Sequence, residues 1–432
     1  MHSAPGPTNP LGALLRLIGL TGAFVASARA EWTIAHGSLT AGASATSMYM
    51  SNAEARQNGS EAFTFSFAPT LDYRRQSALI ETSATAGVEF EHVLDGPGSD
   101  REAKRAGLIF STAKSAGYRF APTLRTLYTE SYTSDLTVNA RIFNRQTTTA
   151  AGGEMTFSPT LTAALISTYE TNRADGYAGR HSLENKGRLE SALGGRRSLF
   201  AEVNHREVAS DDRSAGSTAL DQRALSTTLG FTQGFSTGTK ASIGVGYLDQ
   251  QRSTAETLLR SKGSSGATVM ASIDGPFLPP TLFPKLTSMI RLAFGRLENP
   301  GLQDNGNKQL TGEVAVGWAA RSTTRLGLAA ARTRDLTVND LTMERSRSVA
   351  TVEQSVGNTS RLAATLGYEW MTIRGIIRHS EGAIATFSAS RKLGSRDRWE
   401  SRFNYEYRDL NSSEQVANFS QHTVRLSAIY RL

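Results

Sequence analysis

The sequence predicts an all-β chain that forms a closed antiparallel, up-and-down transmembrane β-barrel of about 18–20 strands. Three observations lead to this fold class. Apolar and polar residues alternate along most of the 432 residues, short turns alternate with longer polar loops, and the chain opens with an apolar segment of export length. Together they place residues 31–432 in one barrel and exclude an ordinary helical domain.

Residues 1–30 are predicted to be a signal peptide. The apolar run Leu17–Ala26 follows Arg16 and precedes Ala28-Arg29-Ala30, which has the A-x-A form of a cleavage box. The run is too short for a spanning helix, which needs about 20 apolar residues. Cleavage would lower the net charge from +8 to +6, because it removes Arg16 and Arg29 and no acidic residue. The absence of Cys excludes disulfides and thiolate metal sites.

The period of two is clearest in four segments, 63–73, 78–91, 362–370 and 399–408. In the first of them, Phe63, Phe65 and Phe67 alternate with Thr64, Ser66 and Ala68, which is the pattern of a strand with one apolar face. Twenty such strands can be marked, and those near 102–112 and 118–131 have the weakest alternation. About 9–11 residues suffice for a tilted strand to span a bilayer.

The connections predict two different rims. Short turns such as 194–196 and 357–359 alternate along the chain with longer polar loops such as 51–60 and 251–263. An up-and-down barrel has this layout, with tight turns at one rim and long loops at the other.

The polar face of each strand distinguishes a membrane barrel from a soluble β-protein. With lipid outside and water inside, only half of each strand is apolar, so a mean hydropathy of −0.31 is expected. A closed sheet also pairs all its backbone groups, which lipid requires. We therefore expect a bacterial outer-membrane location, with a secreted β-solenoid as the main alternative. Aromatic residues near strand ends predict interfacial girdles: Tyr49, Tyr73, Phe90, Tyr169, Trp370, Trp399 and Tyr430.

The last residues carry a further signal. Val424, Leu426, Ala428, Tyr430 and Leu432 alternate with Arg425, Ser427, Ile429 and Arg431 to the end of the given sequence. This strand resembles the terminal signal read by the outer-membrane assembly machinery, although that pattern usually ends in Phe. The assembly machinery is therefore an expected partner, together with outer-membrane lipid and lipopolysaccharide.

The segments Gly37–Ser44 and Phe65–Tyr73, with the turns Phe157–Leu161 and Phe235–Thr239, resemble the β-barrel porin type 2 family of outer-membrane proteins. Members of that family often accompany exopolysaccharide synthesis and export. The resemblance implies that the barrel is the outer-membrane conduit and that a periplasmic polysaccharide-export protein is its partner.

The polar face of the strands carries charged residues of both signs. Two interpretations stay open: a ladder of cross-strand ion pairs that stabilises the wall, or a pore lining whose field selects ions. The candidate pore-lining residues are Glu81, Glu89, Glu91, Arg361, Glu369, Glu400, Arg402, Glu406, Arg408, Arg425 and Arg431.

No catalytic, metal-binding or cofactor-binding residue is predicted. The seven His have none of the spacings used by helical metal sites, and no nucleophile elbow or phosphate-binding loop is present. His92 with Asp95, and His205 with Asp211 and Asp212, could imitate an outer-rim hydrolase, but Ser and Asp are abundant in any set of loops, so we expect no enzyme. Lys-rich runs that would indicate nucleic-acid binding are also missing.

The leading functional hypothesis is therefore an outer-membrane pore that conducts a polysaccharide with a periplasmic partner. The main alternative is a passive diffusion porin for small hydrophilic solutes. A surface adhesin or scaffold is less favoured, because the predicted loops are of moderate length and lack aromatic clusters.

Overall fold

A computed structural model of the chain describes residues 31–34, 36–53, 59–96, 100–112, 119–135, 140–175, 179–211, 220–254, 262–276, 285–297, 307–336, 342–374, 378–393, 398–414 and 417–431. The predicted signal peptide, residues 1–30, lies outside the described residues. No helix in the described part combines the length and the hydropathy that a membrane crossing requires.

Strands dominate the described residues. Their bounds are β1 (Glu31–Ile34), β2 (Gly37–Met50), β3 (Ala62–Gln76), β4 (Ile80–Asp95), β5 (Arg101–Thr112), β6 (Phe120–Asp135), β7 (Ala140–Ser158), β8 (Leu161–Ala174), β9 (Arg180–Gly194), β10 (Arg197–Ser210), β11 (Leu220–Gly234), β12 (Lys240–Thr254), β13 (Lys262–Gly275), β14 (Leu286–Leu297), β15 (Asn307–Trp318), β16 (Thr324–Leu336), β17 (Thr342–Val356), β18 (Ser360–Arg374), β19 (Arg378–Leu393), β20 (Trp399–Ser412) and β21 (Phe419–Arg431). The two weakest predicted strands are real and correspond to β5 and β6.

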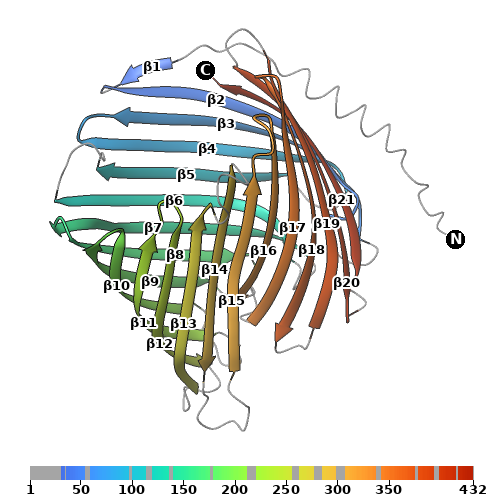
Figure 1. Cartoon of the computed structure of the whole chain (residues 1–432). Coiled ribbons are helices and arrows are strands. Elements are labelled where there is room, and N and C mark those ends of the chain that lie inside the picture. Colours follow the sequence, from blue (N-terminus) through green and yellow to red (C-terminus); the bar gives the residue numbers. More distant parts are fainter. Residues whose placement is uncertain are drawn as a thin grey trace.

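The strands close into one barrel. From β2 to β21 each strand pairs antiparallel with its neighbours in sequence, and β21 returns to β2 through the pairs Gly42↔Arg431 to Met50↔Thr423. β1 adds only a four-pair hairpin to β2. The result is the predicted antiparallel barrel, with 20 strands in its ring. In Figure 1 the strands of one wall, β2–β9, run across those of the opposite wall, as tilted strands of a barrel do.

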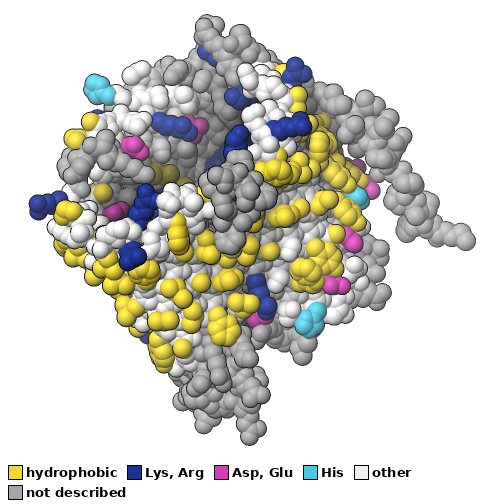
Figure 2. Space-filling view, in the orientation of Figure 1, with side chains coloured by type: hydrophobic (Ala, Val, Ile, Leu, Met, Phe, Trp, Pro, Cys, Tyr) yellow, Lys and Arg dark blue, Asp and Glu magenta, His cyan; other side chains and the backbone are white. Residues whose placement is uncertain are grey.

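The two faces of the wall differ in polarity. Directly paired residues share a face, so the alternation of one strand carries around the ring. Outward-facing leucines are highly exposed, with Leu366 at 67%, Leu229 at 66% and Leu328 at 64%. Figure 2 shows hydrophobic side chains gathered over the front of the molecule, where Figure 1 places β10–β15. An apolar surface of this extent is suited to lipid rather than to water.

Aromatic pairs lie at both ends of the strands, as the predicted girdles require. At the end with the short turns, the rings of Trp399 and Tyr430 lie 4.4 Å apart. Toward the loop end, Tyr368 and Trp370 lie 4.7 Å apart. Both pairs face outward, where amphipathic rings suit the membrane–water interface.

The strands are longer than the prediction of 9–11 residues, with 12 residues in β5 and 19 in β7. Several loops are correspondingly shorter than predicted. The segment 251–263, for example, contributes its ends to β12 and β13. The physical reason is that a paired ladder remains favourable beyond the hydrocarbon layer, so strands continue into the aqueous rim.

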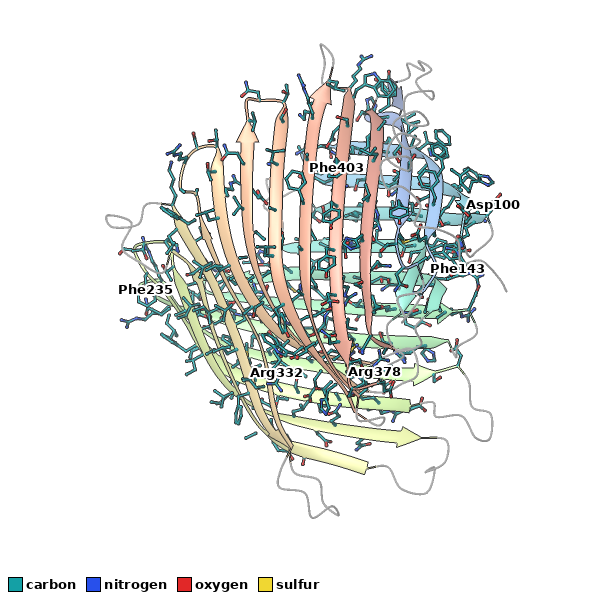
Figure 3. The ribbon with its side chains drawn as sticks, turned by 90° about the vertical axis from the view of Figure 1, so that its right-hand side faces the viewer. Asp100, Phe143, Phe235, Arg332, Arg378 and Phe403 are labelled. Atoms are coloured by element: carbon teal, nitrogen blue, oxygen red, sulfur yellow. The ribbon has the colours of Figure 1, made fainter. Side chains whose placement is uncertain are left out.

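The predicted short turns at 194–196 and 357–359 form, whereas those predicted at 114–117 and 394–396 lie outside the described residues. In the β9–β10 turn, Gly194, Gly195 and Arg196 have φ values of 83°, 58° and 63°, a left-handed conformation that glycine adopts without steric cost. In Figure 3, Phe235 marks the turn end of the barrel, and Asp100 marks the loop end on the far side.

Candidate functional site in the barrel lumen

The inner face of the wall is the candidate site. The pairing places all eleven predicted residues on this face. Directly paired residues share a face, and by this rule each of the eleven lies on the face opposite to that of the exposed leucines. Ten of them have described side chains. Arg431 ends β21, and its side chain lies outside the described part.

Glu369 is the most buried of these residues, with 2% of its side chain exposed. Arg345 of β17 approaches one carboxylate oxygen, with Nε at 2.9 Å. Arg408 of β20 approaches the other, with Nε at 3.0 Å. Each guanidinium also donates a second hydrogen bond to the same oxygen. We call Arg345, Glu369 and Arg408 the arginine clamp. It has one acid and two bases and therefore carries a net positive charge.

The clamp depends on a glycine between its arms. Gly382 of β19 is the direct partner of Glu369, and on its other side it pairs with Leu410. A Cβ at Gly382 would lie 1.8 Å from the carbonyl oxygen of Asp409. Only a residue without a side chain lets β19 and β20 approach closely while Arg408 reaches across β19 to the carboxylate.

A second group of charged residues lies on β9 and β10. Lys186 and Arg188 lie 3.1 and 3.5 Å from Glu202, and Arg188 also lies 3.0 Å from Glu190. Arg188 lies over the ring of Phe200, 4.2 Å from its centroid. We call Lys186, Arg188, Glu190 and Glu202 the charge ladder. Its acids and bases balance, as in the wall-stabilising interpretation.

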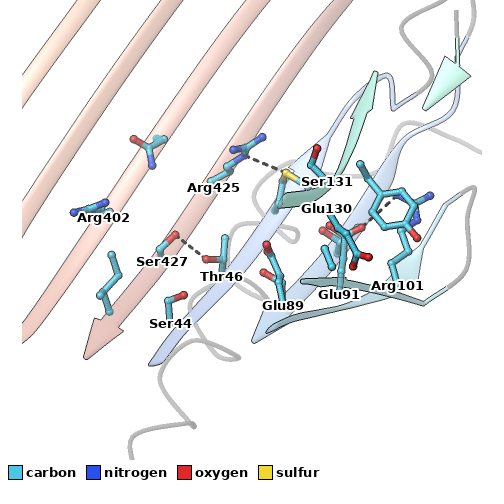
Figure 4. Close-up of a pocket in the computed structure, with 17 residues that line it drawn as sticks. Ser44, Thr46, Glu89, Glu91, Arg101, Glu130, Ser131, Arg402, Arg425 and Ser427 are labelled. Carbon is cyan, nitrogen blue, oxygen red and sulfur yellow. Dashed lines mark hydrogen bonds and ion pairs between the residues drawn. The ribbon is translucent and has the colours of Figure 1, made fainter. Parts of the chain in front are cut away.

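A cavity of about 350 Å³ opens on the inner wall where β2–β6 meet β20 and β21. Figure 4 shows Glu89, Glu91 and Glu130 on one side of it and Arg402 and Arg425 on the other. Five of the predicted residues meet here: Glu89, Glu91, Arg402, Arg425 and, through its ion pair with Arg402, Glu400.

The charges of this cavity are unevenly compensated. Glu91 is paired with Arg101 at 3.4 Å, and Arg402 with Glu400 at 2.6 Å. The guanidinium of Arg425 contacts the sulfur of Met48 at 3.1 Å, and among the described residues it forms no ion pair. Glu89, on the other side of the cavity, likewise forms no ion pair among the described residues, so the cavity offers a cation on β21 and an anion on β4.

The remaining predicted residues are dispersed. Glu81 accepts a hydrogen bond from Gln76 at 3.4 Å near the turn end. Arg361 and Glu406 lie on the inner face opposite Ser390 and Thr386 of β19, so they join neither the clamp nor the cavity.

The loop end of the lumen is partly filled. Ala53, from the loop after β2, packs with the inward-facing Met48, Met50 and Ala62. Beside the clamp, the inward-facing Ile373 and Leu410 are almost fully buried. The loop end is therefore narrowed on the side of β18–β21, β2 and β3.

Several of these residues were missed by the sequence prediction. Arg345 falls in a segment that reads as a polar loop, and the charge ladder lies in strands whose alternation is mixed. Lys186, Arg188 and Glu190 occupy alternate positions of one strand, and this period of two is the sequence pattern that could have predicted the ladder.

The two pairs that could imitate a hydrolase are not formed. His92 bonds Asp100, with 2.6 Å between Nδ1 and Oδ1, and Asp100 also accepts from the backbone N–H of Val93. These hydrogen bonds hold the pKa of Asp100 below its ordinary value. His205 instead lies 3.5 Å from Glu207, and Asp211 lies 3.1 Å from His181. Asp212 lies outside the described residues. The described residues contain no group of three or more His, Asp or Glu that could hold a metal ion.

The fold resembles solved outer-membrane proteins. The ferric citrate transporter FecA in its unliganded form matches 94% of this chain and 79% of its own, with a TM-score of 0.51 and 9% identity. BauA, the ferric preacinetobactin receptor from Acinetobacter baumannii, matches 91% and 80% at 0.53 and 11%. The FrpB iron transporter from Neisseria meningitidis matches 91% and 81% at 0.53 and 8%.

No family model matches the sequence, and no curated protein sequence matches it. The structural likeness supports an outer-membrane β-barrel, and it does not single out the β-barrel porin type 2 family. The closed barrel and its apolar outer face place the chain in a bacterial outer membrane.

Proposed function

We propose that this outer-membrane barrel is a pore for hydrophilic anionic solutes, and that its solute is an anionic polysaccharide supplied by a periplasmic export protein. The observation that carries the proposal is the uneven charge of the inner wall. The residues predicted from the sequence to line a pore contribute to that charge, and the arginine clamp and Arg425 supply part of its positive excess.

The inner face of β16–β21 is basic among its described side chains. It carries nine basic residues, Arg325, Arg345, Arg347, Arg361, Arg378, Lys392, Arg402, Arg408 and Arg425, against four acidic ones, Glu353, Glu369, Glu400 and Glu406. The wall of β4–β9 carries six basic residues, Arg101, Arg105, Arg125, Arg180, Lys186 and Arg188, against seven acidic ones, Glu81, Glu89, Glu91, Glu154, Glu170, Glu184 and Glu190.

A basic wall facing a balanced one has a physical consequence. In a narrow lumen the field of the excess guanidinium groups concentrates anions near β16–β21. Arg is suited to this role, because its planar fork binds carboxylates and phosphates bidentately and it stays charged at any physiological pH. A polymer that carries repeated carboxylates would bind successive arginines along this wall.

Ion selectivity tests the pore. The purified protein in a planar bilayer under a salt gradient should give a zero-current potential with the sign of anion selectivity. Increasing ionic strength should weaken the preference, because salt screens the wall charges. Cation selectivity under the same gradient would contradict the assignment of the basic wall.

The polysaccharide requires its own test. Deleting the gene should abolish surface polysaccharide while other outer-membrane proteins stay at normal levels, and complementation should restore it. Unchanged surface polysaccharide would reject the export role and leave the pore itself intact. A periplasmic partner should be recovered with the barrel after cross-linking in cells, and failure to recover one would count against supply from the periplasm.

The second candidate is a passive diffusion porin for small hydrophilic solutes. The same recordings separate the two. A stable open conductance from the purified barrel alone favours the diffusion porin, whereas a closed barrel that conducts only with its partner favours export. The partly filled loop end of the lumen, with Ala53 packed against Met48 and Met50, supports the closed form.

A further inference from the structure

The wall of the barrel parts between β5 and β6. Their ladder runs from Ser111↔Thr123 to Arg105↔Thr129 and stops there, although β5 continues to Arg101 and β6 to Asp135. On the edge that faces away from the wedge, each of the two strands remains paired with its other neighbour. β4 follows β5 as far as Glu91↔Arg101, and β7 follows β6 as far as Asp135↔Ala140. The separation is therefore a wedge within a closed wall, at its loop end.

A carboxylate fills the wedge. Glu130 accepts a hydrogen bond from the backbone N–H of Lys104 at 2.8 Å, where a strand carbonyl would normally be the acceptor. The hydroxyl of Tyr128 donates to its other oxygen at 2.5 Å, and Arg145 lies 3.9 Å away. Only 10% of the Glu130 side chain is exposed. The two strands are thus joined here by a side chain, which can rotate away, whereas a ladder cannot.

The lumen cavity reaches the wedge. By register, Glu130 belongs to the outer face, opposite Arg145, yet it lines the 350 Å³ cavity together with Ala103, Ser131 and Tyr132. Tyr132 lines the cavity, and its ring lies 4.5 Å from that of Phe143 and 4.4 Å from the guanidinium of Arg101. Arg402 and Arg425 line the cavity from β20 and β21. The path therefore runs from these arginines, past Glu89 and Glu91, to the aromatic rings of β6 and β7.

From this geometry we propose that the wedge between β5 and β6 is a lateral port that binds a monoacyl amphiphile with an anionic phosphate headgroup. The phosphate lies against Arg425 and Arg402, and the acyl chain passes between β5 and β6 beside Tyr132 and Phe143 into the lipid. Glu130 is the gate of the port. This site shares Arg402 and Arg425 with the basic wall, but lipid binding through the wall is measured separately from anion conductance along the barrel axis.

A photoreactive lysophosphatidylglycerol with a diazirine in its acyl chain probes the port. With the full-length barrel in detergent micelles, we expect adducts on Tyr132 or Phe143, mapped by mass spectrometry. Arg425→Ala should reduce this labelling about tenfold, because a charge-assisted contact to phosphate is lost. Glu130→Ala should increase it, whereas Glu130→Gln keeps an oxygen acceptor for the Lys104 N–H and should leave it near the wild-type level.

Closing the wedge gives the decisive control, since the chain has no Cys. Ala103→Cys with Ser131→Cys, joined by a short bifunctional thiol reagent, bridges the wedge and should abolish the adducts. Ser111→Cys with Thr123→Cys bridges the intact part of the same ladder and should not. Equal labelling of the two bridged proteins, or adducts confined to exposed outer leucines such as Leu366, would overturn the port. Both results are independent of the bilayer recordings and of the gene deletion.

Discussion

The charge ladder of β9 and β10 matches two bases to two acids, whereas the arginine clamp of β17–β20 holds one acid between two bases. Lys186, with about half of its side chain exposed, illustrates the ladder, and Glu369, with 2% exposed, illustrates the clamp. Exposed pairs contribute little to stability because water screens them, about 0–1 kcal/mol each. A buried carboxylate is costly without its partners. Similar residues therefore stabilise the wall in one region and create a net field in the other.

A glycine supports each region, but in different ways. Beside the ladder, Gly230 pairs with Phe200, and a Cβ there would lie 2.2 Å from Cζ of that ring and 2.6 Å from the carbonyl oxygen of Ile243. In the clamp, a Cβ at Gly382 would lie 1.8 Å from the carbonyl oxygen of Asp409. The ring can rotate away from a new methyl group, whereas a paired strand cannot, and the backbone contact is closer at Gly382. The clamp is therefore the more rigid of the two.

Removing the acid of the clamp should have the largest effect. Glu369→Ala leaves Arg345 and Arg408 without their common partner and should lower the free energy of unfolding by about 3–5 kcal/mol. Glu202→Ala in the ladder should cost under about 1 kcal/mol, because Lys186 is 49% exposed to water and Arg188 keeps its ion pair with Glu190. Urea unfolding in detergent micelles, followed by gel mobility, measures both. Equal losses would show that burial does not separate the two regions.

We expect substitution of the two glycines to show the same order of destabilisation, with the larger effect in the clamp. Gly382→Ala should destabilise the barrel by about 1–3 kcal/mol, the range for overpacking, because the new methyl meets backbone. Gly230→Ala should cost less, because Phe200 can move and the remaining backbone contact, with the carbonyl oxygen of Ile243, is 2.6 Å rather than 1.8 Å. The same unfolding assay compares them, and a larger loss at Gly230 would reverse the inferred difference in rigidity.

Removing one base from each region tests the field. Arg408→Gln leaves Glu369 paired with Arg345, so the barrel should fold, while the anion-to-cation permeability ratio should fall about twofold as a lumen charge is lost. Arg188→Gln removes the same unit charge from the ladder, and it should change the ratio less, because only the clamp lies beside the narrowed loop end, where a wall charge acts over a shorter distance. Zero-current potentials measure the ratio. An equal change in both variants would mean that the clamp has no special share in selectivity.

The smallest effect should come from an exposed pair outside both regions. The hydrogen bonds from His92 and the Val93 N–H hold the pKa of Asp100 below its ordinary value. The folded state therefore gains stability above the unfolded pKa of Asp, about 3.9, and loses that gain as the pH falls through the lower folded pKa. Asp100→Asn should flatten this acid limb of the stability curve, measured between pH 2 and pH 6. A variant curve parallel to the wild type would contradict this contribution.

The alternation of apolar and polar residues in the sequence predicts the face on which a residue lies, but not its contacts. It placed Glu369 and Arg408 on one face, because the parity of a strand is a property of its own residues. It did not bring them together, because they lie 39 residues apart with β19 between them, and their contact depends on Gly382. Arg345 was missed because the local polarity around it resembles a loop, and only pairing with β18 extends β17 to Thr342.

The sequence by itself determined the barrel class, the lipid-facing and lumen-facing sides of most strands, and the positions of the short turns. These depend on a period of two and on local backbone preferences. Only the tertiary structure decided which charges meet, where the lumen is filled, and where the ladder opens at Glu130. Those features depend on register between strands and on the closure of the ring, which place residues far apart in sequence within a few ångströms of each other.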